Sequence, residues 1–90
     1  MRAVISVVGK DHPGILAFVA QYCADRDINI TDVTQKVLQD LFTMIMTVEV
    51  PSDQEGRFDE LVSDIEAKGE AQGLKIHLMN EEIFHAMHTI

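Results

Sequence analysis

The stretch RAVISVVGKDHPGILAFVAQYC, residues 2–23, predicts a strand, a loop and a helix in succession. Residues 2–8 are mostly apolar and rich in β-branched side chains, which is typical of a buried strand. Asp11 is placed to cap a helix start, and Pro13 suits the first helical turn because that turn needs no amide hydrogen. The predicted helix runs to about Arg26. Its apolar side chains share one stripe, which must face a core: Ile15, Phe18, Val19, Tyr22 and Cys23.

Two further strands are predicted on either side of Gln39-Asp40. Residues 28–38 mix β-branched and polar side chains in rough alternation, and residues 41–50 alternate cleanly, as the arms of a hairpin do. The second arm places its apolar side chains on one face, which is typical of a sheet with one buried side. The predicted buried side chains are Phe42, Met44, Met46, Val48 and Val50.

The last third of the chain predicts a helix, a strand and a short final helix. Ser52 or Asp53 is placed to cap the first of these helices. Residues 74–79 alternate again, as a strand does, and Asn80 is placed to cap a short helix that runs through Met87. The core stripe of the longer helix is Phe58, Leu61, Val62 and Ile65.

This order of elements predicts an α+β fold of the ferredoxin-like βαββαβ type, with a short C-terminal helix added. Right-handed crossovers place two helices on one face of a four-stranded antiparallel sheet, with strands in the order 74–79, 2–8, 41–50, 28–38 or a close relative of it. The opposite face is predicted to stay uncovered, although it is too apolar in places to be stable in water. We therefore expect a homodimer, formed through a sheet edge or through this face. The side chains predicted on the uncovered face are Val4, Ser6, Val8, Thr43, Ile45, Thr47, Lys75, His77 and Met79.

Composition narrows the class of protein. The 90 residues suffice for a single domain, which we expect to span residues 1–90. With 15 acidic and 7 basic side chains, the net charge of -8 argues against binding to a nucleic-acid backbone. Cys23 is the one cysteine, and we expect no leader segment and no membrane span, so a cytoplasmic protein is predicted.

The loop GKDHPGI, residues 9–15, joins a strand end to a helix start. Backbone N–H groups converge at such a point and, with the helix dipole, favour a carboxylate or a phosphate. The alternative is a helix cap and tight turn with no ligand, since every helix has such an end. Asn29, at the predicted start of the second strand, is a second candidate because its amide offers both a donor and an acceptor.

Four segments together resemble the ACT domain family, whose small regulatory βαββαβ modules bind amino acids and other effectors. They are GKDHPGIL at residues 9–16, INI at 28–30, DV at 32–33 and the tail EIFHAM at 82–87. The resemblance covers the whole chain. It points to a stand-alone ACT protein, similar to the ACT modules of formyltetrahydrofolate deformylase and of the glycine cleavage repressor.

The resemblance implies a ligand site between the loop of one subunit and the second strand of another. Carried over residue by residue, it implies Asp11, His12, Gly14, Ile15 and Asn29 as ligand-binding residues. The expected ligand is an amino acid or a related metabolite, and the response is expected to pass to a separate partner protein. Since many ACT modules serve only in assembly, a structural dimerisation module without a ligand is the alternative.

Neither metal chemistry nor catalysis is predicted. His85 and His88 can share one helix face, but a structural zinc site normally takes four Cys or His ligands, and Cys23 belongs to the core stripe. No cofactor is expected. No activated nucleophile or phosphate-binding motif occurs, so an enzyme is not expected. Met79 and Met87 are expected either to pack in the core or to line a dimer contact.

Overall fold

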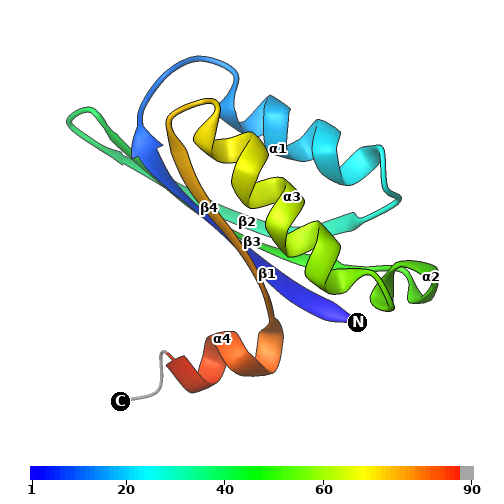
Figure 1. Ribbon diagram of the computed structural model, residues 1–90. Helices are drawn as coiled ribbons and strands as arrows, with labels where there is room; N and C mark the ends of the chain where they lie inside the picture. The colour runs from blue at the N-terminus through cyan, green and yellow to red at the C-terminus, as the bar shows by residue number, and fades with distance from the viewer. Residues whose placement is uncertain (88–90) are drawn as a thin grey trace.

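The computed structural model describes residues 1–87 (Figure 1). Its elements, in chain order, are β1 (Arg2–Lys10), α1 (Ile15–Ala24), β2 (Asn29–Leu38), β3 (Leu41–Glu49), α2 (Ser52–Glu55), α3 (Phe58–Glu70), β4 (Leu74–Asn80) and α4 (Glu81–Met87). This is the predicted βαββαβ order with a final helix, and the ferredoxin-like prediction is confirmed.

The four strands form one antiparallel sheet in the order β2-β3-β1-β4, as predicted. Helices α1 and α3 lie on one face of it, and α4 lies on the other side (Figure 1). We call that other side the open face. Its side chains, set by the strand register, are Arg2, Val4, Ser6, Val8 and Lys10 on β1, Asn29, Asp32, Thr34, Lys36 and Leu38 on β2, Leu41, Thr43, Ile45, Thr47 and Glu49 on β3, and Lys75, His77 and Met79 on β4.

The core lies between the sheet and the helices α1 and α3. The four predicted side chains of β3 and Val50, which follows it, are buried there, as are Leu74, Ile76 and Leu78 of β4. The two helical stripes also face inward, with Phe18, Phe58 and Val62 only partly buried at the margin. The 3.6-residue and two-residue periodicities therefore predicted the core well.

The start of α1 differs from the prediction. Asp11 does not cap it: the N-cap residue is Gly14, which makes no side-chain cap and has a positive φ of 89°. Instead, the Asp11 amide donates to the Asp40 carbonyl at 2.7 Å, so the loop is tied to the β2–β3 turn. The helix then begins at Ile15 and ends at Ala24, two residues before the predicted end.

The helix predicted after Ser52 is divided into α2 and α3, with Gly56 and Arg57 between them. Pro51 is the N-cap residue of α2 and Arg57 that of α3, and neither makes a side-chain cap, so the predicted cap at Ser52 or Asp53 is wrong. Near its end, α3 packs closely on β4. A Cβ atom added at Gly69 would lie 2.6 Å from Ile76 Cγ1, so only glycine fits there.

The prediction that the open face stays uncovered is only half right. Val4, near the start of β1 on that face, is only 2% exposed, and α4 packs over this end of β1 and β4. Asn80 caps this helix as predicted, since its Oδ1 accepts from the Glu82 amide at 2.7 Å. The other end of the face, around Val8 and Ile45, is exposed.

Candidate functional site

The loop between β1 and α1 supplies four of the five predicted site residues. Phe18 is the first amide bonded within α1, and it donates to the Gly14 carbonyl at 2.9 Å. The preceding helical amides, at residues 15–17, therefore lack an intrahelical acceptor. The Ile15 side chain is buried in the core, so this residue offers its backbone alone.

Gly14 leaves open space beside these amides. Its φ of 89° suits glycine, and a Cβ atom added there would have no atom within 4 Å. A ligand oxygen can therefore approach the backbone at this point without meeting a side chain. Positive helix-end charge and free N–H groups together favour a carboxylate.

His12 stands beside Gly14 with one ring nitrogen unsatisfied. Its Nδ1 donates to the Pro13 carbonyl at 3.1 Å. Its Nε2 atom is buried and has no hydrogen-bond partner among the described residues. Because a buried polar atom without a partner destabilises the fold, this nitrogen is suited to a polar group brought by a ligand or by another chain.

Asn29 lies far from this loop within one chain. It starts β2 and pairs with Glu49, which pairs in turn with Arg2 at the first residue of β1. The loop follows Lys10, at the other end of β1, so eight strand steps separate the two rows, about 27 Å at 3.4 Å per residue. A single chain thus brings the four loop residues together but not Asn29.

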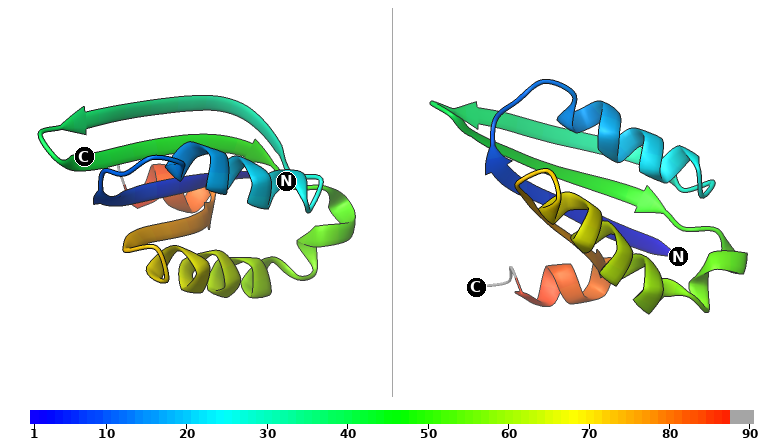
Figure 2. Two further views of the ribbon diagram at one scale, coloured as in Figure 1. Left: turned by 90° about the horizontal axis from the view of Figure 1, so that it is seen from above. Right: turned by 45° about the horizontal axis from the view of Figure 1, so that its top comes forward.

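The exposed edge of β2 is the natural place for a second chain. β2 is at the end of the sheet, and nine of its ten residues are exposed. The β2–β3 hairpin extends past the start of α1 (Figure 2). Val33 and Val37, which the register places on the helix side of β2, are 38% and 45% exposed. An edge strand of this length with uncovered apolar side chains is a template for strand pairing.

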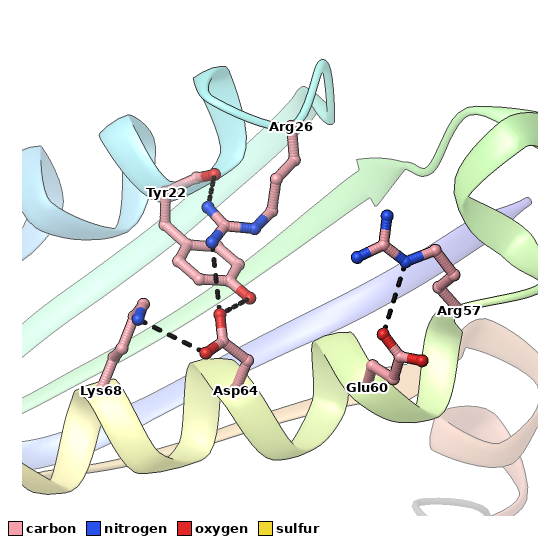
Figure 3. Close-up of polar contacts among 6 residues, drawn as sticks. All are labelled: Tyr22, Arg26, Arg57, Glu60, Asp64 and Lys68. Atoms are coloured by element: carbon pink, nitrogen blue, oxygen red, sulfur yellow. Dashed lines mark hydrogen bonds and ion pairs between the residues drawn. The ribbon is translucent and has the colours of Figure 1, made fainter.

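A polar cluster that the sequence did not indicate bridges α1 and α3 (Figure 3). The Tyr22 hydroxyl donates to Asp64 Oδ2 at 2.8 Å, although the apolar stripe indicated Tyr22 only as core. The Arg26 guanidinium lies 3.6 Å from the centroid of the Tyr22 ring, and it donates to the Tyr22 carbonyl and to Asp64. Lys68 Nζ completes the cluster 3.4 Å from Asp64 Oδ1. The i, i+4 spacing of Tyr22 and Arg26 was its one sequence signal.

The cluster shifts the pKa values of its members. Burial, and then the bond to Asp64, raises the pKa of Tyr22, so its hydroxyl stays a donor. That same bond, helped by Lys68 and Arg26, lowers the pKa of Asp64 below its ordinary value. The cluster therefore joins two helices as a fixed polar contact, with a hollow on either side of Arg26.

The described residues show neither an activated thiol nor a metal cluster. Burial raises the pKa of the Cys23 thiol to about 11, which removes it as a nucleophile at neutral pH. Within residues 1–87, no group of three or more His, Cys, Asp or Glu side chains is placed to hold a metal ion. His85 is on α4, His77 lies 3.5 Å from Glu66, and His88 is outside the described residues. No helix in this part of the chain is long and apolar enough to cross a membrane.

The sequence model of the ACT domain family matches residues 2–79. This chain belongs to that family. A UPF0237 protein of Listeria innocua serovar 6a is 44% identical over 90 residues, which is all of both chains. The solved structure of an ACT domain protein from Streptococcus pneumoniae is 39% identical, with a TM-score of 0.82 over 93% of each chain.

The two kinds of protein named in the sequence resemblance share this fold over part of their chains. A putative glycine cleavage system transcriptional repressor matches 86% of this chain and 43% of its own, at 23% identity and a TM-score of 0.73. A formyltetrahydrofolate deformylase of Pseudomonas putida matches 89% of this chain and 29% of its own, at 16% identity and a TM-score of 0.72. ACT domains are in general regulatory ligand-binding modules, so the family sets the class of function.

Proposed function

We propose that this chain is a regulatory module that binds an amino acid or a related small metabolite between two copies of itself and signals to a partner protein. The proposal is supported by the polar atoms of the β1–α1 loop that lack a partner. They are the amides of residues 15–17, beside the open space of Gly14, and the buried Nε2 of His12. Asp11, His12, Gly14 and Ile15 form one half of the proposed site.

Asn29 of a second copy forms the other half. Antiparallel pairing of two β2 edges, about a twofold axis near the middle of the strand, brings Asn29 of one copy level with Leu38 of the other. Leu38 lies in the row of Leu41 and Lys10, from which the loop starts. The 27 Å separation along the strands is thus removed between chains, and three strand spacings, roughly 14 Å, remain across the sheet.

In this homodimer the loop amides bind the carboxylate of the ligand, and the Asn29 amide binds its other polar groups. The ligand then favours one dimer geometry by its differential affinity for that geometry. The acidic side chains of α2 and α3 form the docking surface for a partner of opposite charge. We place the protein in the cytoplasm and assign it no catalytic step of its own.

A thermal-shift screen against the common amino acids and folates tests this proposal. Ligand that binds the folded state raises the melting temperature in a saturable way. We expect such a rise in the unmodified protein and its loss in Asn29→Ala, with the rise kept in Ser63→Ala, an exposed polar change on α3. No shift with any compound, in folded and dimeric protein, would instead support the alternative of a purely structural dimerisation module.

A further inference from the structure

One of the two hollows beside Arg26 lies between α1 and α3, on the helix side of the molecule. Its volume is about 370 Å³, within the range of roughly 300–1,000 Å³ that small-molecule sites occupy. We call it the interhelical hollow. Its lining is Phe18, Gln21, Tyr22, Asp25, Arg26 and Lys68, none of which belongs to the proposed loop site.

The apolar part of this lining is aromatic. Phe18 and Tyr22 lie one turn apart on α1, at i and i+4, so they share one side of the helix. Tyr22 is buried, whereas Phe18 is only partly buried at the margin of the core. An apolar group placed in the hollow covers the exposed part of the Phe18 side chain, and an aromatic group gains a ring contact in addition.

The charged part of the lining is dipolar. The Asp64 carboxylate lies 3.2 Å from Arg26 Nη2 and 3.4 Å from Lys68 Nζ, so a single negative charge faces two positive charges. Asp25 is the reverse case. It accepts a hydrogen bond from Gln21 Nε2 at 2.7 Å, but no cation among residues 1–87 forms an ion pair with it. The hollow therefore has one positive charge in excess beside α3 and one unbalanced negative charge on α1.

Both charged groups keep atoms that a ligand can use. The Lys68 ammonium group carries three donors, and Asp64 takes one of them. Asp25 binds Gln21 through Oδ1, so Oδ2 makes no hydrogen bond within the described part of the chain. Lys68 and Asp64 on α3 face Tyr22 and Arg26 on α1 (Figure 3), so the two charges approach the hollow from opposite helices.

We propose that the interhelical hollow is a second binding site, which takes a small zwitterion with an apolar body. The ammonium group of the ligand pairs with Asp25, its carboxylate accepts from Lys68, and its apolar body lies against Phe18. A ligand with a single charge leaves one of the two excess charges unbalanced and binds less tightly. Because all of these residues belong to one chain, the site needs neither a second copy nor the β1–α1 loop.

An NMR titration of isotope-labelled Asn29→Ala protein, in which the proposed loop site is disabled, tests this second site. The probes are L-phenylalanine, phenethylamine, which lacks the carboxylate, and 3-phenylpropionate, which lacks the ammonium group. We expect L-phenylalanine to shift the amide signals of residues 18–26 and 64–68 in a saturable way. Each analogue should bind about fivefold more weakly, because it loses one partly screened charge contact. Equal affinity for the three probes, or no saturable shift in these two segments, overturns the proposal.

The variant Asp25→Asn tests the assigned ammonium contact. It removes the charge but keeps an oxygen that accepts from Gln21. We expect the affinity for L-phenylalanine to fall about fivefold, and that for 3-phenylpropionate not to fall. The matched control is Asp27→Asn, an exposed change outside the hollow, because asparagine tolerates the positive φ of 56° at this position. Unchanged affinity for L-phenylalanine in Asp25→Asn, or an equal fall in the control, overturns the assignment whatever the loop site binds.

Discussion

Replacement of Tyr22 by Phe removes one oxygen atom from the contact between α1 and α3. The lost bond is the one from the Tyr22 hydroxyl to Asp64 Oδ2, at 2.8 Å. The aromatic ring stays in the core and under the Arg26 guanidinium, so neither packing nor the cation–π contact changes. The variant therefore isolates a single charge-assisted hydrogen bond.

We expect Tyr22→Phe to lower the free energy of unfolding by about 1 kcal/mol at pH 7. Hydrogen bonds to charged groups stabilise by about 1.5–3 kcal/mol when shielded, and the Asp64 side chain is 41% exposed, so water screens part of that amount. For a chain of this size, such a loss lowers the melting temperature by about 5 °C.

The effect also depends on pH. Because the folded-state pKa of Asp64 is lowered, its stabilising contribution is present above the unfolded pKa of about 4 and is lost as the pH falls through the folded value. Tyr22→Phe removes the largest cause of that lowering. Its unfolding free energy should therefore fall less than that of the unmodified protein between pH 5 and pH 2.

Urea unfolding of both proteins at several pH values between 2 and 7 measures both effects, and Asp64→Ala serves as the companion variant. In the double variant, we expect the loss to be smaller than the sum of the two single losses, since both remove the same bond. Equal stabilities at pH 7, together with parallel pH dependence, would show that the Tyr22–Asp64 bond does not hold the helices together.

Three further changes test other parts of the fold. Gly69→Ala should lower the free energy of unfolding by roughly 1–2 kcal/mol, because the cost of overpacking against Ile76 exceeds the helical preference for alanine. In urea unfolding, adding Ile76→Val should recover part of that loss. If the two losses simply add in the double variant, the clash is excluded. Asn80→Ala should loosen α4 through the loss of a cap of about 1 kcal/mol, seen as faster amide hydrogen exchange within α4 and not in β1; unchanged exchange in α4 would count against the cap. Cys23 should react with a thiol reagent only as fast as the chain unfolds, since it is buried and its pKa is raised to about 11; rapid labelling of native protein at pH 7 would contradict its place in the core.

The fold could be predicted because each element repeats a simple pattern. The alternation along β3 gave its buried face, and the stripes of α1 and α3 gave the helix side of the core. The Asn80 cap was also predictable, because a side-chain cap depends only on neighbouring residues.

The failures concern contacts between distant residues. Asp11 has the right chemistry for a cap, but its amide is held by Asp40 in the hairpin turn, and the chain reverses at Gly14 instead. The cover that α4 provides over Val4 depends on the direction in which the chain leaves β4, which local patterns do not specify. The Tyr22–Asp64 bond likewise joins residues 42 positions apart.

The residues of the candidate site were predicted from the sequence, and the structure shows where each of them lies. The loop residues are neighbours in the chain and stay neighbours in space. Asn29 lies about 27 Å away along β1, at the spacing of 3.4 Å per residue. Its proposed role therefore depends wholly on a second copy.

A mixing experiment tests that dependence most directly. Gly14→Asn keeps a residue type that tolerates a positive φ but fills the open space beside the loop, and Asn29→Ala removes the other half of the site. With the amino acid that gives the largest thermal shift, calorimetry should detect no binding to either variant alone. Exchanged subunits of the two should bind one ligand per mixed dimer, because one of its two sites then combines an intact loop with an intact Asn29. Absence of binding in the mixture, with mixed dimers shown to form, would contradict a ligand site shared between two chains.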